Sequence, residues 1–200
     1  MSIGVAYEDQ WLLIADKPSG LLTVPTPKNE KRTLTGILGL YPCHRLDRET
    51  SGLIIYAKDR KVAQQMMDEF RGRKVKKTYV AFVRGHPQNG RGEIKGRIEG
   101  LSAQTRYKVI EKRKDFSILE IYPLTGRTNQ IRIHLKSIGH PVLGESKFAF
   151  RRDFAIKAKR LMLHALKLEF KHPVSGKLLR LESDLPKYFE DFLSTSGGGS

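Results

Sequence analysis

Short runs of strand-forming residues, separated by turn residues, limit the fold of this chain more than any other feature. Such runs are found at residues 11–15, 51–57, 78–83, 93–98, 103–111, 116–122, 166–170 and 177–181. In 166–170 apolar and charged residues alternate, as they do in a strand with one buried face. Pro173–Gly176 then turns the chain into the next run, which predicts a hairpin. We therefore expect a mixed, mainly antiparallel sheet.

Only a few segments have the spacing of helices. In residues 60–71, Val62, Met66 and Phe70 recur every fourth position and share one helical face. A second helix is predicted at 128–138, and a third after Asp184 and Pro186. A mainly antiparallel sheet with a few flanking helices is the α+β class.

The length of 200 residues suits one domain or two small lobes that share a core. We expect a single domain over residues 1–193 and a flexible tail over 194–200, where Gly197–Ser200 is rich in glycine. Cys43 is the one cysteine, which excludes a disulfide framework and favours a reducing cytoplasm. The sequence has no apolar run of membrane-spanning length and no secretion signal, so we expect a cytoplasmic protein.

The charge balance points to a polyanionic partner. There are 37 Lys and Arg residues against 21 Asp and Glu residues, a formal net charge of +16. The positive residues gather in two runs, 71–77 and 147–160, and such clustering favours nucleic acid over a merely basic soluble protein. Charge alone does not distinguish RNA from DNA.

Motifs for the common cofactors are absent. The sequence has no G-x-x-x-x-G-K-[ST], no H-E-x-x-H and no G-x-S-x-G. The six histidines do not have metal-ligand spacing, and we interpret His134 as a helix-surface residue and His140 as a turn residue. We therefore expect a mechanism without metal, nucleotide or other cofactor.

Two polar segments stand out. In the first, His44–Lys58, Asp47 lies between Arg45 and Arg48, two cations that favour the ionised carboxylate. This aspartate is either a nucleophile on a loop or part of an ordinary surface salt-bridge cluster. In the second, 123–135, a glycine turn enters a helix, which is either a phosphate-binding helix start or a capped amphipathic helix with solvated arginines.

These segments resemble the motifs of the RluA-type RNA pseudouridine synthases. His44–Lys58 resembles the catalytic motif of that family, and 125–144 resembles its later G-R-T-x-Q-[IL]-R-x-H and G-H-P-[IV]-L-G-[DE] motifs. Shorter likenesses are Asp16–Gly20, Lys76–Tyr79 and Leu161–Ala165, and all five follow the family order. The resemblance implies the pseudouridine synthase catalytic fold and an enzyme that isomerises uridine in RNA.

The resemblance also implies roles for single residues. Asp47 would attack the target nucleotide so that the base detaches, turns and rejoins through C5. Tyr79 would stack on the uracil, and Arg132 would pair with Asp47 and hold it in place. Arg45 would fill the space left by the flipped base, and Leu163 would contribute to the apolar floor of the pocket.

The expected partner is a structured ribosomal or transfer RNA, bound by a monomer. Because the first strand begins near Met1, an N-terminal S4 domain has no room, and RNA affinity is expected from the basic surface, including Arg127, Arg151 and Arg152. Asn129 stands where the family most often has His, and we assign it no role.

Two other functions compete with the enzyme. One is a non-catalytic RNA-binding or ribosome-assembly protein of the same fold, and the other is a DNA-binding protein. Asp47, Tyr79 and Arg132 together favour the enzyme, and a DNA-binding helix-turn-helix or zinc-finger pattern is missing.

Overall fold

The structure is a computed structural model of the 200-residue chain. It describes all residues except 1–2, 28–29, 31, 149–155, 157 and 197–200. The chain divides into two compact units, residues 1–77 with 165–183 (unit 1) and residues 78–164 with 184–200 (unit 2). Unit 1 contains the segment with Asp47, and unit 2 contains Tyr79 and Arg132.

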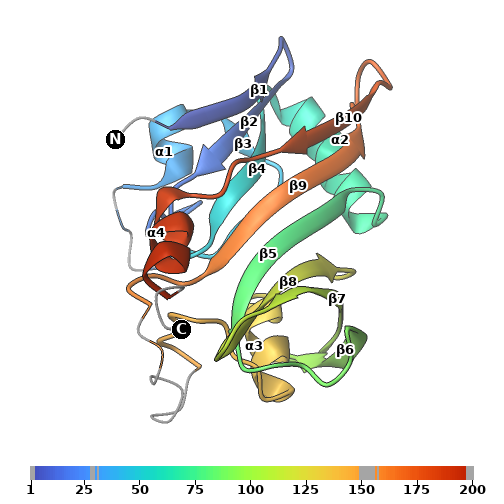
Figure 1. Cartoon of the computed structure of the whole chain (residues 1–200). Coiled ribbons are helices and arrows are strands. Elements are labelled where there is room, and N and C mark those ends of the chain that lie inside the picture. Colours follow the sequence, from blue (N-terminus) through green and yellow to red (C-terminus); the bar gives the residue numbers. More distant parts are fainter. Residues whose placement is uncertain (1–2, 28–29, 31, 149–155, 157, 197–200) are drawn as a thin grey trace. The chain divides into compact units, whose positions relative to one another are not determined.

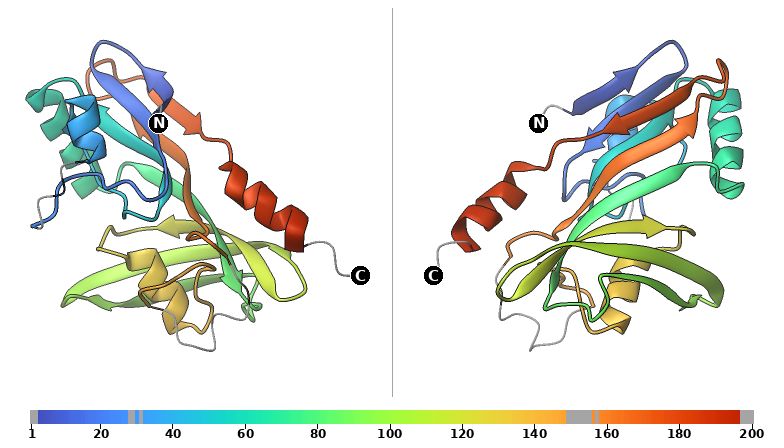
Figure 2. Two further views of the ribbon diagram at one scale, coloured as in Figure 1. Left: turned by 90° about the vertical axis from the view of Figure 1, so that its left-hand side faces the viewer. Right: turned by 45° about the vertical axis from the view of Figure 1, so that its right-hand side comes forward.

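Unit 1 is built on a sheet of hairpins (Figures 1 and 2). Its order is β1-β2-β4-β9; in addition, β10 pairs with β9, and β3 pairs with β4. The bounds are Gly4–Glu8 for β1, Leu12–Lys17 for β2, Tyr41–Pro42 for β3, Ser51–Ala57 for β4, Leu163–Lys171 for β9 and Leu178–Glu182 for β10. Every residue of β4 is buried, because this central strand lies within the core. β2 and β4 are antiparallel, with Lys17 opposite Gly52 and Leu12 opposite Ala57.

Two helices belong to unit 1. α1 (Leu34–Leu38) begins at Thr33, whose side chain accepts a hydrogen bond from the backbone N–H of Gly36. α2 (Arg60–Arg71) is capped in the same way by Asp59, which accepts from Val62. The face of α2 with Val62, Ala63 and Met66 packs into a core that also includes side chains of β2, β4, β9 and β10.

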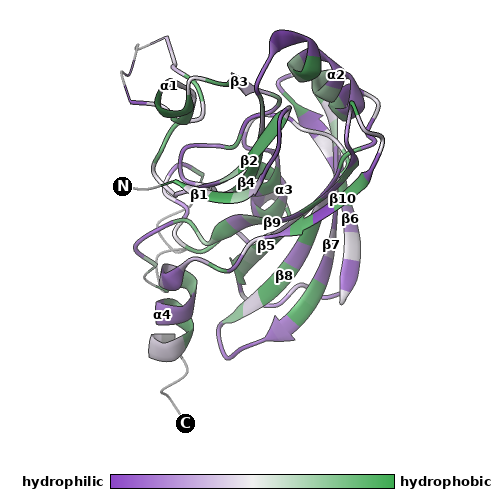
Figure 3. Cartoon of the chain, turned by 90° about the horizontal axis from the view of Figure 1, so that it is seen from above, coloured by the Kyte–Doolittle hydropathy of each residue, from purple (hydrophilic) through white to green (hydrophobic). Residues whose placement is uncertain are grey.

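Unit 2 is a meander in the order β5-β8-β7-β6 (Figure 1). The strands are β5 (Lys76–Arg84), β6 (Arg91–Ile98), β7 (Leu101–Lys112) and β8 (Phe116–Pro123). Figure 3 shows the alternation of hydrophilic and hydrophobic residues along β7 and β8 that two-faced strands require. α3 (Gln130–Ser137) contacts β6, β7 and β8, and α4 (Lys187–Ser196) follows Pro186.

An aromatic cluster joins α4 to the meander. Phe82 of β5 meets Phe189 of α4 edge to face, with ring centroids 4.9 Å apart. Phe116 and Phe192 make a second edge-to-face pair at 5.4 Å. Such pairs are favourable beyond the area that they bury, so the apolar face of α4 has a specific place within unit 2.

The structure confirms the predicted fold class and most elements. The helix at 60–71 and the strand at 51–57 agree residue for residue with α2 and β4. The short elements β1, α1 and β3 were not predicted, since five residues or fewer are too short for a clear periodic pattern. α4 continues to Ser196, three residues into the predicted tail. Among the described residues, none of the helices has the length and apolar character needed to cross a membrane.

Gly52 provides a test of the sheet in unit 1. Its φ is +111°, and a Cβ at this position would collide with the backbone carbonyl of Ala165. We expect Gly52→Ala to lower the free energy of unfolding by about 3 kcal/mol or more, because backbone strain and a steric clash add. Urea denaturation would measure the change. Gly90→Ala is the matched control, since a Cβ there meets no atom within 4 Å, and equal stability of the two variants would contradict the packing described.

Candidate active site

The segment with Asp47 is a loop over residues 43–50 that joins β3 to β4. Thr23 holds its middle, because the Thr23 hydroxyl donates to the carbonyl of Leu46 at 2.9 Å and accepts from the Leu46 N–H at 3.2 Å. The carbonyl of Asp47 accepts from the N–H of Thr50. The backbone on both sides of the aspartate is therefore fixed by hydrogen bonds.

A buried lysine lies beneath this loop. Lys17 has no exposed surface, and its ammonium donates to the carbonyl oxygens of Leu21 at 2.8 Å, Arg48 at 3.1 Å and Pro18 at 3.1 Å.

Burial lowers the pKa of Lys17 to about 7, although the carboxylates of Asp47, Glu49 and Asp16 act to raise it. One cation thus ties the turn after β2 to the loop and places positive charge in the field of Asp47.

Two further contacts complete the attachment of the loop to that turn. The N–H of Gly20 donates to the carbonyl of Arg48 at 2.8 Å, and the hydroxyl of Ser19 donates to the carbonyl of Glu49 at 2.7 Å. Arg48 returns a bond from its Nε to the carbonyl of Gly20. The Asp47 segment is therefore more than a surface cluster of charges, since its backbone is built into the unit.

The segment with Arg132 is anchored by buried amide and imidazole groups. Gln130 on α3 donates to the carbonyl of Gln104 and to the hydroxyl of Thr105, both at 3.0 Å. Its own carbonyl oxygen accepts from Thr125 and from the N–H of Arg127. The polar residues of this helix therefore lock it to β7.

Two sequence interpretations of this helix are wrong. His134 was interpreted as a surface residue, but it is only 3% exposed, and its Nδ1 lies 2.9 Å from the Thr105 hydroxyl. Arg132 was weighed as a solvated cation, but it too is only 3% exposed. His134 faces β7 through Thr105, whereas Arg132, two positions earlier on the helix, is buried against Glu145. His140 does lie in the turn after α3, where its Nδ1 is 2.8 Å from the carbonyl of Arg84.

Arg132 forms a forked ion pair inside unit 2. Its Nε and Nη2 lie 2.6 Å from the two carboxylate oxygens of Glu145, and its Nη1 donates to the side-chain oxygen of Asn129 at 3.0 Å. Burial raises the pKa of the Glu145 carboxyl, but hydrogen bonds and charge from Arg132 outweigh burial and keep the pKa below its usual value. Arg132 is therefore a fixed guanidinium rather than a mobile one.

The remaining predicted site residues have separate places. Tyr79 is buried on β5, opposite Ile121 of β8, and Leu163 is buried at the first position of β9. Arg127 precedes α3 and donates from Nε to the carbonyl of Ser102 at 3.1 Å. Arg45 is exposed on the loop before Asp47.

The predicted basic runs are only partly described. In 71–77, three cations have ion-pair partners within unit 1: Arg71 with Asp68, Lys74 with Glu69 and Lys76 with Glu169. Such exposed pairs contribute little to stability. In 147–160, Arg151 and Arg152 lie outside the described residues.

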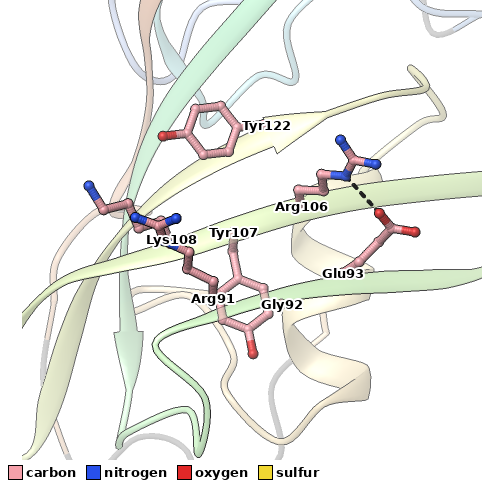
Figure 4. A pocket seen from close by; sticks show the side chains of 7 residues that line it. All are labelled: Arg91, Gly92, Glu93, Arg106, Tyr107, Lys108 and Tyr122. Atoms are coloured by element: carbon pink, nitrogen blue, oxygen red, sulfur yellow. Dashed lines mark hydrogen bonds and ion pairs between the residues drawn. The ribbon is translucent and has the colours of Figure 1, made fainter.

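A shallow basic hollow of roughly 630 Å³ lies on unit 2 (Figure 4). It is lined by Arg91, Gly92, Glu93, Arg106, Tyr107, Lys108 and Tyr122. Figure 4 shows Tyr122 and Tyr107 pointing to opposite sides of the strands. Gly92 leaves room for the ring of Tyr107. A Cβ at position 92 would lie only about 2.5 Å from that ring, too close for an ordinary contact. The hollow combines cations with aromatic rings, but Glu93 already pairs with Arg106 at 2.6 Å.

Within the part of the chain that the structure describes, His, Cys, Asp and Glu side chains do not gather in threes as a metal site requires. His44 is held as a neutral base, because burial and the nearby Lys77 ammonium lower its pKa to about 3. Cys43 is buried, and burial raises the pKa of its thiol to about 12.

Comparisons with known proteins identify the family of this chain. Residues 11–137 match the family model described as RNA pseudouridylate synthase. The dual-specificity RNA pseudouridine synthase RluA of Yersinia pestis is 37% identical over 194 residues, which cover 86% of this chain and 94% of that protein. The ribosomal large subunit pseudouridine synthase C of Buchnera aphidicola is 34% identical over 221 residues, covering 96% of this chain and 70% of that protein.

Solved structures show the same fold. The human protein RNA Pseudouridylate Synthase Domain Containing 4 superimposes with a TM-score of 0.82 at 25% identity, covering 96% of this chain and 92% of that chain. The chain therefore belongs to the RluA-type RNA pseudouridine synthase family. It is a pseudouridine synthase, an isomerase, and this favours the enzyme over the binding-protein and DNA-binding alternatives.

Several residues that fix the Asp47 segment or the Arg132 segment have no role predicted from the sequence. Lys17 lies in the short motif at Asp16–Gly20, and Glu145 ends the motif at 139–145. Both were visible as motif members, but their burial and their partners depend on long-range packing. Gln130 was likewise part of a recognised motif, and its contacts with β7 come from residues about 25 positions away.

Lys17 gives a test of pH dependence. Its folded pKa of about 7 lies below the ordinary value of 10.5, so between these values the folded protein binds fewer protons than the unfolded chain. The cost of burying the ammonium is complete below pH 7 and declines as the pH rises toward 10.5. The stability of the wild type relative to Lys17→Met should therefore rise by about 1.4 kcal/mol per pH unit above pH 7. Urea titrations at pH 6, 7.5 and 9 would measure it, and a constant difference would exclude the lowered pKa.

Proposed function

We propose that this enzyme converts a specific uridine in a structured ribosomal or transfer RNA to pseudouridine, with Asp47 as the catalytic carboxylate. The observation that carries the proposal is the fixed loop around Asp47. Its backbone is bonded to Thr23, Gly20 and the buried ammonium of Lys17. A carboxylate on a fixed backbone is preorganised for attack, which lowers the entropic cost of reaching the reactive geometry.

The chemistry needs few groups. The N1–C1′ bond of the uridine breaks, a C5–C1′ bond forms, and a proton passes from C5 to N1, so atoms and electrons balance without a co-reactant. Asp47 supplies the attacking carboxylate. Arg132 is assigned by the family likeness to the orientation of Asp47, and this pairing stays a prediction. A bidentate guanidinium would hold the carboxylate charged and correctly turned.

Three residues are proposed to hold the flipped nucleotide. Tyr79 stacks on the uracil, Leu163 forms the apolar floor, and Arg45 fills the space that the base leaves. The burial of Tyr79 and Leu163 and the exposure of Arg45 are compatible with these roles. A flipped base costs a few kcal/mol of stacking, which contact with an aromatic ring partly offsets.

The names of the relatives support an RNA substrate. One relative is named a dual-specificity RNA pseudouridine synthase and another a ribosomal large subunit pseudouridine synthase, which supports ribosomal RNA as one candidate. Transfer RNA is the second candidate and comes from the family resemblance. Arg127, Arg151 and Arg152 are proposed to bind the phosphates. A cytoplasmic monomer that needs no cofactor also remains a prediction. Pseudouridine mapping of total RNA with and without the gene would identify the RNA and the position.

The role of Asp47 is tested by Asp47→Asn, which keeps the shape of the side chain and removes its charge. We expect a folded protein with no detectable pseudouridine formation, because the amide is a poor nucleophile. Single-turnover assays on the mapped RNA would measure the rate, and circular dichroism would check folding. Turnover near the wild-type rate in this variant would rule out Asp47 as the nucleophile.

The role of Tyr79 is tested by a pair of variants. Tyr79→Phe keeps the ring, and Tyr79→Ala removes a stack worth about 1–3 kcal/mol. We expect Tyr79→Ala to lose roughly 10- to 100-fold in kcat/KM and Tyr79→Phe to retain the affinity that depends on the ring. Equal losses in both variants would assign the effect to the hydroxyl instead of the stack.

A further inference from the structure

Arg132 is held from two sides by groups that sequence reasoning did not connect with it. Glu145 takes its Nε and Nη2, each at 2.6 Å, and both side chains are almost fully buried. Asn129 takes Nη1 at 3.0 Å. Together these bonds use three of the five N–H groups of the guanidinium. They fix the plane of the guanidinium and the direction of the edge formed by its two terminal nitrogens, Nη1 and Nη2. Each of these nitrogens carries one further N–H.

The conformation of Asn129 supports a directed role. Asn129 is the N-cap of α3, where an asparagine side chain normally accepts from a backbone N–H of the first turn. Here the side chain makes no capping bond, and the backbone is left-handed, with φ +54° and ψ +22°. Asparagine tolerates this region better than most residues. The amide is therefore directed to Arg132 at the expense of the helix cap.

Glu145 is itself held in place. Its Oε1 accepts from the N–H groups of Lys147 at 2.8 Å and Phe148 at 3.2 Å. The ring of Phe148 lies beneath the guanidinium of Arg132, with 5.2 Å between the guanidinium carbon and the ring centroid. Gly144, with φ +75°, makes the turn before Glu145 and lies against the backbone of Arg160, where a Cβ would not fit. The carboxylate thus joins α3 to the turn at 142–148.

We propose that Glu145 and Asn129 are positioning residues that fix the direction in which Arg132 presents its end-on N–H groups to the catalytic carboxylate. The inference rests on the proposed function, in which that carboxylate belongs to Asp47. A guanidinium free to rotate would lose part of its bidentate geometry, and the carboxylate would be less well oriented and less strongly kept charged. In this chain Asn129 orients Arg132 from a position where the family most often has histidine.

The first arm of the experiment separates the side chain of Asn129 from its backbone. Asn129→Gly keeps access to the left-handed conformation and removes the side chain with its acceptor oxygen. We expect its single-turnover rate at saturating RNA to fall on the order of tenfold, with unchanged RNA affinity, because misdirected catalytic groups cost rate rather than binding. Asn129→Asp restores an acceptor oxygen and should recover most of the rate. Ser137→Ala, at the exposed end of the same helix, controls for general disturbance of α3.

The second arm uses the pH profile, which a purely structural role would not move. Weaker support of the catalytic carboxylate raises its pKa, so the acid limb of the rate–pH profile should shift upward. We expect a shift of about half a unit or more in Asn129→Gly and in Glu145→Gln. Glu145→Asp keeps the charge and should shift less. Should Glu145→Gln fail to fold, the Asn129 pair alone decides the question.

The outcomes separate two failures. An active wild type, an inactive Asp47→Asn, and Asn129 and Glu145 variants with wild-type rate and acid limb would overturn this inference and leave the proposed function standing. A rate loss that only follows lost RNA binding or lost folded protein would also overturn it. An active Asp47→Asn would instead remove the proposed function, and this inference with it.

Discussion

The buried ammonium of Lys17 is the interaction on which the proposed catalytic loop depends. A charge without access to water must find fixed acceptors, and Lys17 finds three backbone carbonyl oxygens, two from the turn after β2 and one from the loop with Asp47. Backbone acceptors carry no net charge, so they hold the protonated amine without neutralising it. Burial lowers the pKa of Lys17 to about 7, and the carboxylate of Asp47 acts to raise it, so the charge on Lys17 and the charge on Asp47 support each other.

In unit 2 the buried cation Arg132 is held by an opposite charge instead of by backbone carbonyl oxygens. Arg132 meets a full carboxylate, Glu145, in a forked pair. Buried ion pairs often contribute little net stability compared with apolar packing, because desolvation of both charges opposes their attraction. Their use here is geometric, since a paired and hydrogen-bonded guanidinium has one orientation. The two units thus hold their cations by different means, one by carbonyl oxygens and the other by an opposite charge.

Residue patterns predicted the elements better than the contacts. The alternation of apolar and charged residues in 166–170 predicted β9, and the apolar residues at every fourth position in 60–71 predicted α2. Both patterns follow from local backbone geometry alone. The motifs likewise marked Asp47, Tyr79 and Arg132 as candidates. Sequence reasoning placed His134 on the surface, since a helical pattern of apolar residues does not show that polar neighbours also face the sheet. The role of Glu145 was hidden for a similar reason, as its partner lies 13 positions away on another element.

The end of β3 shows how a strand releases a loop. β3 pairs with β4 only through Tyr41 and Pro42, and Cys43 adds one bond from its N–H to the carbonyl of Ile55. The N–H of Ile55 then bonds to the imidazole of His44 at 3.0 Å. The His44 side chain thus accepts the bond that a backbone carbonyl would accept if β3 continued. The backbone after His44 is therefore free to leave the β3–β4 pairing. Since the pKa of His44 is about 3, the imidazole stays an acceptor at every pH near neutrality, and the point of strand exit does not move with protonation.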